Sequence, residues 1–187
     1  MGGLVIKKAY ILAKRDPLYH NIASRFHTMF FIATPHRGAD SAQLLSNLLR
    51  AASLGNHAYL ADLRKNSTST EAINDEFRHV CDQLRLYSFY ETVPTNLGIN
   101  STLIVEKDSA ILGYTRERTA YINADHRGVC KFDSPEDPNF LILRNAFVST
   151  IDEVIADCTL NPSSHLAACA LLKQSPGGFS FCPLPLP

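Results

Sequence analysis

The pattern of hydrophobic and polar residues predicts a helix and then a buried strand in the first part of the chain. Residues 4–14 are apolar on nearly all sides, as in a largely buried helix, and Asp16-Pro17 ends it. The pair Gly2-Gly3 lets the backbone at the start of this helix approach a neighbouring strand closely. Residues 29–33 form a short apolar run closed by the turn at residues 34–38, which suits a buried parallel strand.

A one-sided apolar stripe predicts the next helix, and Thr70 stands where its N-cap would be. Residues 86–91 are rich in aromatic side chains and strand-like, residues 103–105 suit a short strand or an edge ribbon, and residues 118–123 indicate another strand. The apolar positions of the helical stripe are Ile73, Phe77, Val80 and Leu84.

Ser134 is the expected N-cap of the last major helix, with Pro135 at its first position and acidic residues in its first turn. Strands separated by helices indicate an α/β fold, in which helices cover both faces of a parallel sheet. Residues 53–69 are polar and are expected to be mobile. One domain is expected at residues 1–158, followed by a disordered, Pro-rich tail at residues 159–187.

Composition and charge fit a globular protein. The 187 residues are 45% hydrophobic and 19% charged, as in a chain that buries a core. The 18 basic and 18 acidic side chains cancel, so electrostatics gives no reason to expect nucleic acid or an anionic membrane as a partner. No stretch of the sequence approaches the roughly 20 apolar residues that span a bilayer. The sequence also contains no metal-ligand cluster, phosphate loop or cofactor fingerprint.

The cysteines indicate an intracellular protein. They are scattered, odd in number and without a Cys-x-x-Cys pair, so neither a disulfide framework nor a structural zinc site is expected. Reduced thiols suit the cytoplasm. The basic residues of the first helix also resemble a mitochondrial presequence, so a mitochondrial or membrane-peripheral location is the alternative. The five cysteines are Cys81, Cys130, Cys158, Cys169 and Cys182.

The first residues, Met1-Gly2-Gly3, resemble the second half of a nucleophile elbow. In the Gly-x-Ser-x-Gly elbow, a tight turn between a strand and a helix exposes a serine Oγ. If Met1 follows that serine, the nucleophile would directly precede this chain. These 187 residues are therefore expected to lack it. The serines without the strand, glycine and helix context of an elbow include Ser41, Ser46, Ser53 and Ser109.

Five segments carry a resemblance to a known family. They are, in chain order, MGGLVIKKA, FIATPHRG, SFYET, EKDSA and NADHRGVCKF. Over about residues 1–157, the chain resembles the C-terminal half of the lipase-like serine esterases of the α/β-hydrolase fold. This family includes the serine active site-containing protein of animals and hydrolase domains of fungal NACHT, ankyrin or TPR proteins. The resemblance implies an α/β-hydrolase-like sheet whose N-terminal half, with the nucleophile strand, is absent.

The resemblance also implies a triad in the chain order serine, acid, histidine. His126 matches the histidine and would act as the general base. Glu91 matches the acid that orients it, and Asp108 is the rival for this role. Asp125, next to the histidine, is expected to orient the loop backbone. His36 closes the first strand and could line the same cleft.

The resemblance implies a reaction as well. One oxyanion donor in this fold is the N–H of the residue after the serine, which is Met1 here. The intact domain is expected to hydrolyse ester or lipid acyl bonds without a cofactor, whereas this chain alone is expected to be inactive. The alternative is a non-catalytic interaction or regulatory module from a fungal NLR-like multidomain protein, with protein partners bound through an exposed sheet edge.

Overall fold

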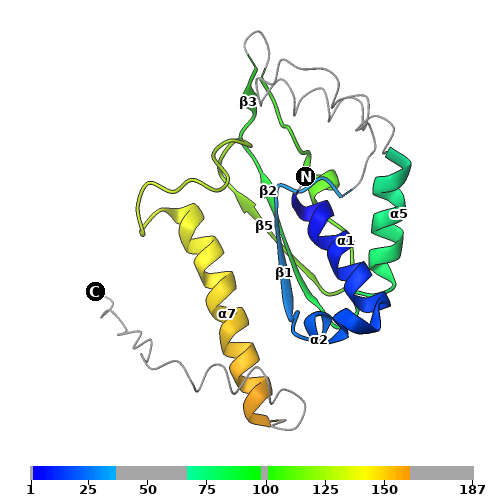
Figure 1. The fold of residues 1–187 in the computed structure, drawn as a ribbon. Helices are drawn as coiled ribbons and strands as arrows, with labels where there is room; N and C mark the ends of the chain where they lie inside the picture. Colours follow the sequence, from blue (N-terminus) through cyan, green and yellow to red (C-terminus); the bar gives the residue numbers. More distant parts are fainter. Residues whose placement is uncertain (1, 37–66, 98–100, 161–187) are drawn as a thin grey trace. The chain divides into compact units, whose positions relative to one another are not determined.

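Three parallel strands form the central sheet of the computed structural model (Figure 1). Strand β2 (Arg85–Glu91) lies between β1 (Thr28–Ile32) and β5 (Glu117–Ile122) and pairs in parallel with both. The α/β class with a parallel sheet, predicted from the sequence, is therefore confirmed. The structure describes residues 2–36, 67–97 and 101–160.

One face of the sheet is covered by α1 (Gly2–Arg15) and α5 (Ser67–Arg78), which lie side by side (Figure 1). Their side chains share a core with alternate residues of the strands, because successive residues of a strand face opposite sides of a sheet. This core contains Tyr10, Ile11, Met29, Phe31, Phe77 and Leu86.

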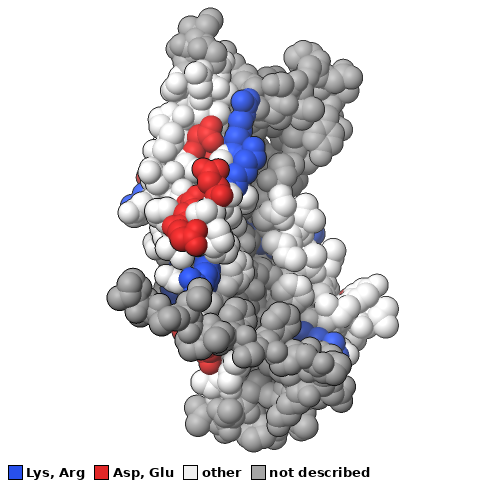
Figure 2. Space-filling model, turned by 90° about the vertical axis from the view of Figure 1, so that its left-hand side faces the viewer, with Lys and Arg blue, Asp and Glu red and all other residues white. Residues whose placement is uncertain are grey.

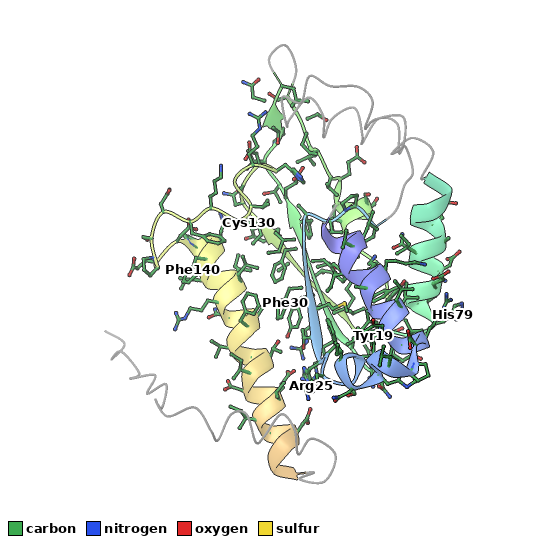
Figure 3. The ribbon with its side chains drawn as sticks, viewed as in Figure 1. Tyr19, Arg25, Phe30, His79, Cys130 and Phe140 are labelled. Atoms are coloured by element: carbon green, nitrogen blue, oxygen red, sulfur yellow. The ribbon has the colours of Figure 1, made fainter. Side chains whose placement is uncertain are left out.

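The other face of the sheet carries a second core. Phe30 of β1 lies on this face (Figure 3), and its ring stacks on Tyr87 of β2 with 4.8 Å between the ring centroids. The first turns of α7 (Pro138–Leu160) contribute Ile142 and Leu143 to this core. Helices therefore pack against both faces of the sheet, as the sequence predicts.

Helix α1 is buried along one stripe only, so the prediction of a largely buried helix is wrong. Tyr10 and Ile11 are buried, whereas Val5 is 67% exposed and Leu12 is 52% exposed. A helix that packs on a sheet turns one stripe toward the core, whatever its other sides carry. The helix ends before Asp16-Pro17, as predicted. It is followed by the short turn η1 (Pro17–Tyr19) and by α2 (His20–Ala23).

Helix α5 differs from its prediction at both ends. It begins at Ser67, so Thr70 lies within the helix and is not its N-cap. The helix ends at Arg78, before the last positions of the predicted apolar stripe. Val80 and Leu84 nevertheless pack with the core, because the chain turns back toward the sheet after the helix.

Helix α7 begins at Pro138, later than the sequence predicts. The Asp137 carboxylate accepts a hydrogen bond from the N–H of Asn139 (2.8 Å), so Asp137 caps the helix. The Ser134 hydroxyl accepts a hydrogen bond from the N–H of Glu136 (3.2 Å) and stabilises the preceding turn instead. Two capping signals lie close together here, and the second one starts the helix.

A short antiparallel ribbon of β3 (Thr95–Asn96) and β4 (Ser101–Thr102) follows β2. The strand predicted at residues 103–105 does not form. Two N–H groups of this segment instead donate to the side chain of Glu91, so they are not available for a strand ladder. The segment leads into α6 (Lys107–Ala110).

The chain divides into two compact units, residues 1–146 and residues 147–187. Of the second unit, the structure describes the remainder of α7. None of the described helices is long and apolar enough to cross a membrane. The predicted oxyanion residue Met1, most of the polar segment that precedes α5, and the Pro-rich tail beyond residue 160 lie outside the described residues.

Charged side chains of both signs lie next to one another on the face drawn in Figure 2. The described residues therefore form no extended field of one sign on this face. This distribution fits the formal net charge of zero and gives the visible face no electrostatic preference for an anionic partner.

Candidate active site

The Glu91 side chain is buried at the carboxyl end of β2, where main-chain donors hold it. The N–H groups of Ile104 and Val105 both donate to Oε1, at 2.5 and 2.9 Å. The side chain is 0% exposed, so the carboxylate depends on such bonds to replace its lost hydration. Residues 103–105 thus form a main-chain cradle for one carboxylate.

His126 lies in the loop after β5 and contacts the other oxygen of Glu91. Its Nδ1 is 2.7 Å from Oε2 of the carboxylate. An ionised carboxylate only accepts hydrogen bonds, so the neutral imidazole carries its proton on Nδ1 and keeps a lone pair on Nε2. The His126 side chain is 24% exposed, and the ring therefore remains accessible from solvent.

Two polar side chains fix the loop that carries His126. Asp125 Oδ1 accepts a hydrogen bond from the N–H of Gly128 (2.8 Å), so Asp125 orients the loop backbone as predicted. The hydroxyl of Thr95 accepts a hydrogen bond from the N–H of His126 (3.2 Å). The sequence gives no signal for Thr95, because this contact joins two residues 31 positions apart.

Of the two acids predicted from the resemblance, the structure brings Glu91 to His126. Asp108 is exposed in the first turn of α6. Within the described part of the chain, no hydrogen bond or ion pair joins Asp108 to His126. The geometry therefore supports a pair made of His126 and Glu91.

The start of α1 reaches the same edge of the sheet. A Cβ atom on Gly3 would lie 2.3 Å from Cγ2 of Thr34, which follows β1, so a larger residue would force the helix away. A Cβ atom on Gly2 would meet nothing within 4 Å. The carboxyl ends of parallel strands share one edge, where α/β folds usually place their sites. Gly3, Glu91 and His126 all belong to segments at this edge.

A second polar cluster lies beneath the turn that follows β1. Lys7 is 0% exposed, and its Nζ is 2.6 Å from His36 Nδ1 and 2.7 Å from Asn74 Oδ1. The same nitrogen lies 5.2 and 5.4 Å from the ring centroids of Phe31 and Phe77. His36 is 1% exposed, so the expectation that it lines the cleft is wrong.

The burial of Lys7 has an electrostatic consequence. Removal of the ammonium from water disfavours its charged form and lowers the pKa of Lys7 to about 7. A signal for this burial exists in the sequence, because Lys7 follows Gly3 by four positions and precedes Ile11 by four. These three residues share the helical face that packs against the core.

The chain is similar to Protein SERAC1. The identity over 134 residues is 29% with the Bos taurus protein, 28% with the Danio rerio protein and 27% with the Homo sapiens protein. Each alignment covers 70% of this chain but 20% of the relative, so the chain spans about a fifth of the length of the curated relatives it matches. No family model matches the chain, and no solved structure matches it.

A cavity of about 690 Å³ opens at the opposite edge of the sheet, where β2 and β5 begin. Its lining includes Leu84, Leu86 and Arg116 but neither member of the Glu91–His126 pair. This cavity is therefore not part of the candidate site. Within the described residues, no group of three His, Cys, Asp or Glu side chains is placed to bind a metal ion.

Proposed function

We propose that this chain supplies the histidine and the acid of a serine hydrolase site that cleaves ester bonds, including the acyl bonds of lipids. The observation that carries the proposal is the 2.7 Å contact between His126 Nδ1 and Glu91 Oε2. In this role His126 is the general base, and Glu91 is the carboxylate that orients it.

The arrangement suits base catalysis by Nε2 of His126. A serine hydroxyl beside Nε2 gives its proton to the imidazole while Oγ bonds to the carbonyl carbon of the ester. The carboxylate of Glu91 stabilises the imidazolium, which then passes the proton to the leaving alcohol. A water molecule repeats both steps on the acyl-enzyme and releases the acid, which regenerates the serine.

The nucleophile in this proposal is a serine directly before Met1. The close packing of Gly3 on Thr34 supports this position, because it brings the start of α1 to the edge that carries His126. The residue after the serine donates one oxyanion hydrogen bond, and loss of such a donor costs on the order of a hundredfold or more in rate. The 187 residues alone are therefore expected to show no turnover.

A fluorophosphonate probe tests the proposal on this chain and on the product of the same gene translated from upstream in-frame codons. Only the longer polypeptide is expected to be labelled, at the serine before Met1. We expect His126→Gln to abolish labelling. Glu91→Gln should slow labelling on the order of ten-thousandfold, because its amide N–H₂ favours the wrong imidazole tautomer. His79→Gln changes an exposed histidine and is the matched control.

Three outcomes would count against the proposal. Labelling of the 187-residue chain at a serine would contradict the assigned position of the nucleophile. Equal labelling of the longer polypeptide with and without His126→Gln would contradict the assignment of the base. Upstream codons that lack an in-frame Gly-x-Ser would remove the elbow itself.

One observation favours a second function, a non-catalytic interaction module. Within the described residues, β1 has a neighbouring strand on one side only. An unpaired strand edge accepts a strand from another protein through main-chain hydrogen bonds. A stable stoichiometric complex, together with no probe labelling of the longer polypeptide, would favour this function over hydrolysis.

A further inference from the structure

The buried amine of Lys7 has no carboxylate among its hydrogen-bond partners in the described structure. Its partners are Nδ1 of His36 and Oδ1 of Asn74, at 2.6 and 2.7 Å. The rings of Phe31 and Phe77 lie close enough for cation–π contacts, which replace part of the lost hydration of an ammonium. A buried charge without an opposite charge beside it remains costly, so the amine is poised to lose its proton.

The contact between Lys7 and His36 limits the pair to one positive charge. An ammonium and an imidazolium both lack a lone pair to accept a hydrogen bond, and they repel each other in a buried site. Either a charged Lys7 donates to Nδ1 of a neutral His36, whose ring proton is then on Nε2, or one proton leaves to water and Nδ1–H of a neutral His36 donates to a neutral amine. Burial lowers the pKa of Lys7 to about 7, so the two forms exchange near neutral pH.

The neighbouring elements supply little charge to offset this burial. Glu117, in β5, favours the charged form of Lys7, as a thiolate at Cys81, after α5, would, but burial outweighs both. Burial also raises the pKa of Cys81 to about 11, so this thiol is uncharged at neutral pH. On α5, Glu76 pairs with Lys8 at 3.1 Å. Arg15 also pairs with Glu76, His20 Nε2 contacts the Lys14 carbonyl, and the hydroxyl of Tyr114 donates to the Asn74 carbonyl.

His36 joins this cluster to the element that follows the Glu91 cradle. Its N–H donates to the carbonyl of Ser109 in α6 (2.7 Å), and its carbonyl accepts from Nδ2 of Asn74. Helix α6 follows Ile104 and Val105, whose N–H groups donate to Glu91, after a single intervening residue. The turn after β1 is thus bonded to α1, α5 and α6 at once.

We propose that Lys7 and His36 share one exchangeable proton, and that this buried pair is a positioning unit for the Glu91–His126 pair. Neither residue touches a reacting atom, and both act through α6 and the amides of Ile104 and Val105. The positioning role rests on the hydrolase function proposed above, whereas the shared proton does not depend on it.

An NMR titration of the lysine Nζ and Cε signals in the 187-residue chain tests the shared proton. One lysine amine is expected to titrate near neutral pH, and this signal should be missing from Lys7→Met. Lys8→Met alters the adjacent, solvent-accessible lysine and should leave the titration in place. Alkaline titration of every lysine amine would overturn the proposal.

The low-field Nδ1–H resonance of His126 tests the positioning role in the same samples. We expect it to shift as Lys7 titrates, to move in Lys7→Met and to stay in place in Lys8→Met. His36→Gln keeps an oxygen acceptor for the amine, so it should retain the resonance but weaken its response to pH.

A His126 resonance that responds neither to the titration nor to Lys7→Met would overturn the positioning role. If Lys7→Met does not fold, the response of the His126 resonance to pH in the unsubstituted chain tests the positioning role alone. Failure of fluorophosphonate labelling in the longer polypeptide would remove the hydrolase function and leave the lysine titration as a valid test of the shared proton.

Discussion

Two histidines at the same edge of the sheet have opposite surroundings. His126 contacts the Glu91 carboxylate at 2.7 Å, and its side chain is 24% exposed. His36 contacts the Lys7 amine at 2.6 Å and is 1% exposed. The residue type is the same and the contact lengths are nearly equal. The chemistry of each ring is therefore set by the charge of its partner and by its access to water.

The comparison shows why only one of these rings suits base catalysis. Glu91 stabilises a positive charge on the ring of His126, so that ring can take a proton from a substrate group. Lys7 repels such a charge on His36, and burial keeps substrate away from it. The pair with the carboxylate is therefore the proposed catalytic pair, and the pair with the amine is the proposed positioning unit.

Glu91→Ala should cause the largest loss of stability. It also removes the carboxylate that distinguishes the surroundings of His126 from those of His36. The substitution leaves the amides of Ile104 and Val105 without their acceptor and creates a cavity at the end of β2. We expect a loss of about 3 kcal/mol in the free energy of unfolding, measured by chemical denaturation. Glu71→Ala, at an exposed position of α5, should change it by less than about 0.5 kcal/mol. A mild effect of Glu91→Ala would mean that the cradle is solvated.

Gly3→Ala should cause the next largest loss of stability. Gly3 lies in α1, one helical turn before Lys7, where the helix packs on the turn after β1. The added Cβ would lie 2.3 Å from Thr34 Cγ2, so we expect a loss of about 2 kcal/mol in unfolding free energy. Gly2→Ala is the matched control and should be neutral or slightly stabilising, because its Cβ has open space and alanine favours a helix. Thr34→Ala should recover part of the loss in the double variant. Equal effects at Gly2 and Gly3 would show that α1 does not pack closely on this turn.

Local patterns in the sequence predict the three strands of the parallel sheet well, but they also predict a strand at residues 103–105 that does not form, and they place the starts of α5 and α7 poorly. The predicted strands at residues 29–33, 86–91 and 118–123 differ from the observed ones by one residue at their ends. Buried parallel strands such as β1 and β2 are short apolar runs with clear limits, so the pattern itself is sufficient there. At α7 both Ser134 and Asp137 can cap a helix, and the choice between them depends on the packing of the helix that follows.

The two histidine pairs could be predicted from sequence to different extents. His126 and Glu91 were candidates through a family resemblance, and their contact joins residues 35 positions apart. The burial of Lys7 follows from its place on the core-facing side of a helix. Its partners, 29 and 67 positions away, do not follow from any local pattern. The sequence thus indicates which residues are important in both pairs. It does not indicate which partner each residue contacts, because those contacts form only when the chain folds.

The pH dependence of stability sharpens the comparison further, since it reports the proton of the buried pair. Lys7 has a folded-state pKa of about 7 and an ordinary value of 10.5, so between these values the unfolded chain binds a proton that the folded chain does not. Stability conferred through Lys7 therefore rises with pH over this window, by at most about 1.4 kcal/mol per pH unit. Denaturation at several pH values should show this rise relative to Lys7→Met, whereas Lys8→Met should follow the unsubstituted chain. Parallel curves for all three proteins would contradict the lowered pKa.

Thr95→Val should have the smallest effect and tests how tightly the exposed histidine is held. Valine keeps the shape of threonine but removes the hydroxyl that accepts from the N–H of His126. We expect a loss of about 1 kcal/mol in unfolding free energy and a broadened Nδ1–H resonance of His126, because the loop gains freedom. Thr102→Val, at the paired position of the ribbon, removes a longer bond to the Leu103 carbonyl (3.3 Å) and should leave the resonance sharp. A sharp resonance in both variants would mean that Glu91 alone fixes His126, and the difference between the two histidines would then rest entirely on their charged partners.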